Sequence, residues 1–111
     1  MTRGYHLPAK YVIHTVGPIW EGGHEDEDAL LASCYQTSLA LAEAHSVQTI
    51  AFPAISTGIY GFPLERATRI AVAQTQRFLE GHALPAQVIF VCFSGGAYQV
   101  YQDVVRELIA P

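Results

Sequence analysis

The alternation of short apolar runs with longer amphipathic stretches is the feature that most constrains this sequence. Three runs are rich in β-branched and aromatic residues, and their length is typical of strands: Lys10–Val16, Thr49–Ile55 and Val88–Phe93. A turn with glycine or proline follows each run. Beyond each turn, apolar or small residues recur every three or four positions. The pattern predicts three strands, each followed by a helix.

The predicted helices cover Asp28–His45, Leu64–Glu80 and Ala97–Ile109. Strands that alternate with helices favour a parallel sheet with right-handed crossovers, so the expected class is α/β. The carboxyl ends of parallel strands open onto one edge, where ligands usually bind. We therefore expect Thr15–Pro18, Ser56–Phe62 and Phe93–Gly96 to converge there.

Composition narrows the class of protein. Of the 111 residues, 50% are hydrophobic and 14% are charged, which favours one ordered domain over a disordered chain. A net charge of −4 with a single lysine argues against binding to duplex nucleic acid. Neither a membrane-spanning run nor a signal peptide is recognisable, so we expect a soluble, cytoplasmic protein. Cys34 and Cys92 fit reduced core thiols better than a disulfide.

The turn Ser56–Phe62 is the strongest candidate for chemistry. It leaves a strand and enters a helix through Gly58 and Gly61, so backbone N–H groups could meet an anion at the positive end of the helix dipole. The glycines could equally serve only to turn the chain. Tyr60 and Phe62 could clamp a sugar or base, and we include both as candidate ligand contacts; the alternative is that they pack on their own helix.

Other polar residues carry weaker signals. Arg66 and Arg69 could add charge to a bound phosphate, although a water-facing position fits them better. The histidines lack metal-ligand spacing, so no metal and no cofactor are expected. Ser56 lacks the G-x-S-x-G elbow of a hydrolase nucleophile, and Cys92 has no visible base, so covalent catalysis is not expected.

Several motifs agree with one family in order and spacing along the whole chain. They are Thr2–Pro18 (TRGYHLPAKYVIHTVGP), Leu31–Tyr35 (LASCY), Phe52–Pro63 (FPAISTGIYGFP) and Val91–Phe93 (VCF). With these motifs the chain resembles the macro domain family, in its MacroD-like branch. The resemblance implies ADP-ribose, free or on a modified protein, as the ligand. It also implies a three-layer α/β/α fold with a mainly parallel sheet.

The resemblance suggests where the ligand would lie. It implies that the loop wraps the diphosphate and distal ribose with Ser56, Thr57, Gly58, Ile59, Tyr60 and Gly61. It places Phe93 and Ser94 beside the adenosine part, although family members often have an acid where Ser94 stands. Tyr60 is the one residue of this chain that we consider as a contributor to catalysis, and packing is the alternative for it.

The chain departs from the family pattern at its front. Macro domains begin with further strands, a helix with an adenine-anchoring Asp, an Asn-Ala-Ala-Asn segment and a glycine-rich loop with the catalytic acid, and none of these is in this sequence. Residues 1–111 are therefore interpreted as one incomplete macro domain. The missing strand would lie between Tyr11–Val16 and Thr49–Ile55. Without it we expect a marginally stable chain, an oligomer formed through strand edges, or completion by another segment.

Three functions remain open at this point. Complete relatives hydrolyse mono-ADP-ribose from proteins or deacetylate O-acetyl-ADP-ribose, and the leading hypothesis is an ADP-ribose-binding module in which that activity is weak or lost. The second is a non-catalytic binder of ADP-ribose or another nucleotide diphosphate. The third is an inert fragment of a longer protein.

Overall fold

A computed structural model describes residues 2–3, 11–13, 17–53, 55, 61–92 and 94–109. Along the chain the elements are β1 (Thr2–Arg3), β2 (Tyr11–Val12), α1 (Glu27–Ala44), β3 (Thr49–Phe52), α2 (Leu64–Gly81), β4 (Gln87–Phe90) and α3 (Gly95–Leu108). Strands alternate with helices as the sequence predicts, so the α/β class is confirmed. The three helices begin and end within two residues of their predicted bounds.

The strands form two separate two-stranded sheets among the described residues. β3 and β4 are parallel, with Thr49 opposite Gln87 and Phe52 opposite Phe90. β2 pairs antiparallel with β1, a pairing that the sequence does not predict because residues 2–3 show no strand pattern. β2 and β3 are not paired with each other among the described residues.

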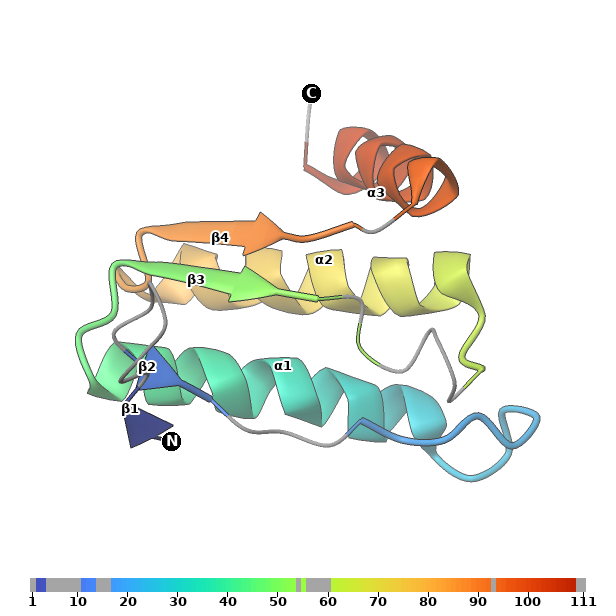
Figure 1. Ribbon diagram of the computed structural model, residues 1–111, viewed down its shortest axis with the longest axis horizontal. Helices are drawn as coiled ribbons and strands as arrows, with labels where there is room; N and C mark the ends of the chain where they lie inside the picture. The colour runs from blue at the N-terminus through green and yellow to red at the C-terminus, as the bar shows by residue number, and fades with distance from the viewer. Residues whose placement is uncertain are drawn as a thin grey trace.

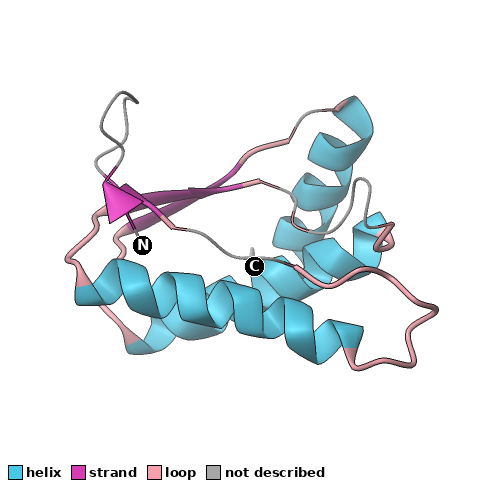
Figure 2. Cartoon of the chain, turned by 60° about the horizontal axis from the view of Figure 1, so that its bottom comes forward, coloured by secondary structure: helices cyan, strands magenta, loops and turns pink. Residues whose placement is uncertain are grey.

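Helices cover one face of the parallel pair. α1 packs against α2, and α2 packs against α3 (Figure 1). Figure 2 shows α1 and α2 on the same side of the strands. The core between these layers contains the buried side chains of Leu31, Tyr35, Leu39, Phe52, Phe62, Ala67, Ala71, Val72, Tyr101 and Val104. Of the three predicted layers, the described residues supply the sheet and one helical layer.

The other face of the parallel pair is exposed. Side chains alternate along a strand, so Phe52 and Phe90 point toward the helices, whereas Ala51 and Ile89 point away from them. Ile89 is 43% exposed, and Val91, just beyond β4, is 36% exposed. Parallel sheets are normally covered on both faces. This apolar surface is therefore unusual for a parallel sheet.

The structure also describes both cysteines and the length and polarity of the helices. Cys34 is buried in α1 and Cys92 is half-buried after β4, and neither forms a disulfide, as predicted. No helix in the described ranges is both long and apolar enough to cross a membrane.

Candidate functional site

The candidate loop lies between β3 and α2, and the structure describes its two ends. Ser56, Thr57, Gly58, Ile59 and Tyr60 lie outside the described residues, as does Phe93. Ile55, just before the loop, and Gly61 and Phe62, at its end, are described. The described part of the site therefore consists of these two ends and the residues that contact them.

Gly61 ends the loop in a conformation that favours glycine. Its φ is +73°, in the left-handed region, and among the described residues no heavy atom lies within 4 Å of a Cβ added to it. α2 begins three residues later, after Pro63, which provides no side-chain cap. The first N–H groups of α2 are thus free of a capping side chain, and helix N-termini of this kind attract anions.

Phe62 points into the core and not into solvent. It is 2% exposed, and its ring lies 4.9 Å from the ring of Trp20, centroid to centroid, at a tilt of 58°. The packing alternative expects this ring to lie on its own helix, whereas its ring contact is with Trp20. This contact means that the residue directly after the loop is held by a side chain from the segment before α1.

That preceding segment is organised by one buried carboxylate. Glu27, the first residue of α1, is 2% exposed. Its Oε2 accepts hydrogen bonds from the backbone N–H groups of Glu21 (2.8 Å) and Gly23 (2.9 Å), and its Oε1 accepts one from Glu25 (2.6 Å). Burial by itself would raise the pKa of Glu27, but these hydrogen bonds and its own backbone N–H lower that pKa to about 2.

Acidic residues at the start of a helix are usually interpreted as complementing the helix dipole and aiding solubility. For Glu27 that interpretation is incomplete, because its carboxylate closes the loop that connects Glu21 to α1.

Arg66 ties the same segment to α2. Its guanidinium donates Nε–H and Nη2–H to the two carboxylate oxygens of Asp28, both at 2.7 Å, and its Cζ lies 5.0 Å from the ring centroid of Trp20. The hydrogen bonds to Asp28 raise the pKa of Arg66, so the side chain stays charged. Its side chain is 47% exposed. Arg66 therefore faces water, as predicted, but as part of an ion pair.

Arg69 is also paired with carboxylates. Its Nη2 lies 2.6 Å from Oε2 of Glu107 in α3 and 3.4 Å from Oε1 of Glu65. The arginines nearest to the loop in sequence are thus both neutralised. An anion in the loop would depend mainly on backbone N–H groups and the dipole of α2.

Ser94 has a defined structural role in the described chain. It is the N-cap of α3, and its Oγ accepts a hydrogen bond from the N–H of Ala97 at 3.1 Å. The side chain is exposed. The suggested contact of Ser94 with adenosine remains a prediction.

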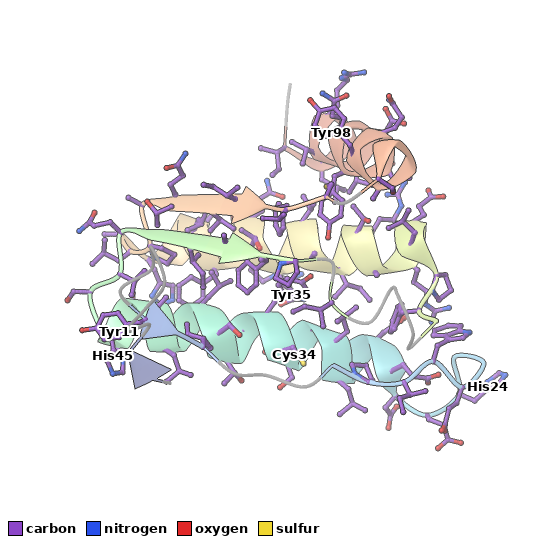
Figure 3. All side chains as sticks on the ribbon, viewed as in Figure 1. Tyr11, His24, Cys34, Tyr35, His45 and Tyr98 are labelled. Atoms are coloured by element: carbon purple, nitrogen blue, oxygen red, sulfur yellow. The ribbon has the colours of Figure 1, made fainter. Side chains whose placement is uncertain are left out.

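Tyr35 of α1 lies in the core cluster against which Ile55, the residue before the loop, packs. Tyr35 is 1% exposed, and Figure 3 shows it between α1 and the strands. Its hydroxyl interacts with the backbone N–H of Ile55 and with the hydroxyl of Tyr101. Burial, together with Tyr101, raises the pKa of Tyr35 far above its ordinary value. This phenol therefore stays protonated and serves as a hydrogen-bonding group, not as a base.

A shallow hollow of about 350 Å³ lies elsewhere on the described surface, next to the acidic segment. Its lining comprises Gly17, Pro18, Ile19, Glu21, Glu25, Glu27 and Leu30. The carboxylates make it a poor place for a phosphate. Within the described ranges, no three His, Cys, Asp or Glu side chains converge as a metal site would require.

Comparison with known proteins gives a consistent result. Residues 1–71 match the Macro domain family. A macro domain-containing protein of Methanosarcina mazei is 60% identical over 94 residues, which cover 85% of this chain and 50% of that protein. The O-acetyl-ADP-ribose deacetylase of Escherichia coli is 48% identical over 107 residues, which cover 96% of this chain and 60% of the enzyme.

Solved structures agree in fold. The macrodomain of Oceanobacillus iheyensis with ADP has a TM-score of 0.92 at 40% identity; the match covers 97% of this chain and 56% of that one. The Trypanosoma brucei macrodomain in complex with ADP-ribose has a TM-score of 0.85 at 43% identity; the match covers 94% of this chain and 43% of that one. The chain thus spans about half to three-fifths of the length of the curated relatives named here.

Proposed function

The chain belongs to the macro domain family, and from this premise we propose that it binds ADP-ribose, with the loop at residues 56–61 around the diphosphate. Two observations support the proposal. One related macrodomain has been solved with ADP-ribose and another with ADP. At the end of the loop, Gly61 adopts a left-handed conformation and leads into a helix without a capping side chain.

The charge distribution predicts how the ligand would be held. Arg66 and Arg69 are committed to carboxylates, so the pyrophosphate would be bound by N–H groups and the helix dipole. A helix N-terminus supplies only about half an elementary charge, so it attracts a phosphate less than an unpaired arginine would. We therefore expect discrimination between ADP-ribose and inorganic pyrophosphate, with the ribose and adenosine contributing much of the affinity.

Catalysis is a further proposal, because the chain spans only part of its relatives. One relative is named O-acetyl-ADP-ribose deacetylase. The family resemblance implies that this chemistry needs a water held between the phosphate and a glycine-rich loop that this sequence lacks. If the water and the catalytic acid are misplaced, the rate of hydrolysis falls by orders of magnitude. We propose that the 111 residues bind ADP-ribose but turn over O-acetyl-ADP-ribose or ADP-ribosylated protein far more slowly than a full-length relative.

Titration calorimetry with ADP-ribose, ADP and AMP tests the binding proposal. Gly61→Ala should weaken binding about tenfold, because an alanine at this φ is strained by about 1–2 kcal/mol and the loop end must shift. Gly81→Ala is the matched control, since Gly81 closes α2 in open space without a positive φ, and its affinity should equal that of the wild type. No heat of binding with ADP-ribose at millimolar concentration would contradict the proposal and favour an inert fragment.

Activity assays on the same protein distinguish a non-catalytic binder from an enzyme. Release of acetate from O-acetyl-ADP-ribose and of ADP-ribose from a modified protein are measured against a full-length relative. Saturable binding without release would favour the non-catalytic module. Turnover at the rate of the full-length relative would contradict the proposed loss of activity.

A further inference from the structure

The hollow beside the first turn of α1 exposes apolar side chains to solvent. Its volume is about 350 Å³, and Ile19 and Leu30 are part of its lining. Ile19 is 58% exposed and Leu30 is 51% exposed. A single exposed aliphatic side chain is common on a protein surface and needs no explanation. Two of them in one hollow form an apolar surface, and covering that surface with an apolar group is favourable.

Two carboxylates accompany the apolar side chains. Glu21 and Glu25 line the same hollow and are exposed. None of the ion pairs among the described residues includes either of them. Arg66, the cation that is tied to this segment, is already paired with Asp28. The hollow therefore has negative charges that the described part of the chain leaves uncompensated.

The backbone that carries these carboxylates is fixed by Glu27. Its Oε2 accepts a hydrogen bond from the N–H of Glu21 at 2.8 Å, and its Oε1 accepts one from the N–H of Glu25 at 2.6 Å. Because Glu27 is buried, water does not compete for these hydrogen bonds. A surface whose backbone is fixed before a partner arrives loses less conformational entropy on binding. The hollow is therefore preformed.

A lysine or arginine side chain matches both properties of the hollow. Such side chains pack their aliphatic stems on apolar surface and keep the charged head in water. The stem would cover Ile19 and Leu30, and the ammonium or guanidinium group would lie near Glu21 and Glu25. The hollow is shallow, and ligand pockets have volumes of roughly 300–1,000 Å³, so about 350 Å³ is at the lower end. One or two side chains of a polypeptide fit such a hollow better than an enclosed small molecule does.

The charges disfavour other occupants. Two copies of this chain with their hollows face to face would bring the same carboxylates together, and each copy has a net charge of −4. A phosphate is repelled for the same reason. A metal ion needs several converging ligands, and no three His, Cys, Asp or Glu side chains converge within the described ranges.

We propose that this hollow binds a segment of a partner protein in which a lysine or arginine stands next to an aliphatic residue. The charged side chain pairs with Glu21 and Glu25, and the aliphatic parts of the segment cover Ile19 and Leu30. Complementary charges of this kind contribute mainly specificity and association rate. The interaction does not depend on the proposed binding of ADP-ribose, so either can fail without the other.

A peptide titration followed by amide NMR of the isotope-labelled protein tests the proposal. The probe is the peptide Gly-Lys-Leu-Arg-Leu-Gly with blocked termini. It should shift the amide signals of Glu21, Gly23 and Glu25 in a saturable way, with a dissociation constant below about 1 mM. The peptides Gly-Glu-Leu-Glu-Leu-Gly and Gly-Lys-Ser-Arg-Ser-Gly should bind at least about tenfold more weakly. Absence of saturable shifts with the first peptide, or equal shifts with all three, would overturn the proposal.

A pair of charge variants separates the hollow from the net charge of the protein. Glu21→Gln combined with Glu25→Gln keeps both backbone N–H groups and should weaken binding of the basic peptide about fivefold. Glu80→Gln combined with Asp103→Asn is the matched control, because it removes two charges from exposed positions elsewhere. Its affinity should equal that of the wild type. Equal weakening in both double variants would show a non-specific attraction and overturn the proposal.

The apolar contact has its own pair of variants. Leu30→Gln should weaken binding of the basic peptide about threefold, because the stem loses its apolar contact. Ile109→Gln is the control, since Ile109 is 48% exposed at the end of α3, and it should bind as the wild type does. Equal affinity of Leu30→Gln and the wild type would contradict the apolar contact.

Two further outcomes would assign the hollow to another occupant. Leu30→Gln might dissociate an oligomer in size-exclusion chromatography without changing peptide affinity, and the occupant would then be a second copy of the chain. Calcium chloride alone might produce the same saturable amide shifts, and the hollow would then be a cation site. Either result would overturn the proposal. The expected results are an unchanged elution volume for Leu30→Gln and no saturable shifts with calcium.

Discussion

At the scale of single residues, Glu27 shows how a charged side chain can serve as a structural centre. Its buried carboxylate accepts hydrogen bonds from three backbone N–H groups of the segment that precedes α1. A buried anion is tolerated only when such donors surround it. The loop thus depends on the charge of Glu27, which makes its stability depend on pH.

The direction of that dependence follows from the pKa. In the folded protein the pKa of Glu27 is about 2, below the value of 4.5 for a free glutamate. The carboxylate therefore stabilises the fold fully above about pH 4.5, and this contribution is lost as the pH falls from there toward 2. Glu27→Gln should lower the urea midpoint at pH 7, and the difference from the wild type should shrink at pH 3. Glu25→Gln, at an exposed position of the same loop, is the control and should leave the midpoint unchanged; an equal loss in both variants would contradict the role of Glu27.

Thr75 gives the opposite case, a polar atom whose burial costs stability. Its Oγ1 is buried without a hydrogen-bond partner in the described structure. Valine has the same shape without the hydroxyl, so Thr75→Val should raise the free energy of unfolding by about 1 kcal/mol. Chemical denaturation checks this, with Thr68→Val as the contrasting variant, because that hydroxyl is bonded and its loss should destabilise. A less stable Thr75→Val protein would show that the hydroxyl has a partner.

At the scale of elements, the segment before α1 is bound to α2 by side chains. Trp20 contacts Phe62 and lies under Arg66, and Arg66 pairs with Asp28. Trp20 is the only tryptophan of the chain, so its fluorescence reports on this contact alone. Arg66→Ala should increase quenching of Trp20 by acrylamide and shift its emission to longer wavelength. Arg77→Ala, an exposed position further along α2, should change neither; equal quenching in the wild type and Arg66→Ala would contradict the contact.

The elements also show what a sequence can and cannot predict. The spacing of Leu31, Tyr35 and Ala42 puts them on one helical face, and that face of α1 is buried; spacing along one helix is a local property that a sequence shows. In α2 the buried face includes Thr68 and Thr75, and a pattern of apolar residues does not include threonines. The β1–β2 pair was missed for a different reason: two residues per strand carry too little pattern, and their pairing depends on tertiary contacts.

The sequence predicts the candidate loop but not the residues that pack around its two described ends. Glycine spacing and the strand-to-helix transition indicated the loop. Its described end, Gly61, has the positive φ that such a turn requires. The ends of the loop pack against Trp20, from the segment before α1, and against the core that contains Tyr35 of α1. No local pattern encodes such partners, so they become visible only in three dimensions.

At the scale of the whole molecule, the exposed face of β3 and β4 predicts the behaviour in solution. Among the described residues the parallel sheet consists of β3 and β4, with apolar side chains exposed on its outer face, and strand edges that are not covered pair with other chains. We expect the 111-residue chain to be marginally stable or to associate at micromolar concentration, as seen by size-exclusion chromatography with light scattering. Ile89→Lys, which places a charge on the exposed face, should reduce association. A sharp monomer with a cooperative thermal transition would contradict this expectation.

The contacts of Arg66 have an evolutionary consequence. One planar guanidinium bonds to both oxygens of Asp28 and also lies over the indole of Trp20, and lysine has neither the fork nor the flat face to do both. The three side chains should therefore be inherited as a set. In an alignment of homologues, lineages that lose this arginine are expected to have replaced the tryptophan and the aspartate as well, and independent replacement of the three would show that selection does not act on them together.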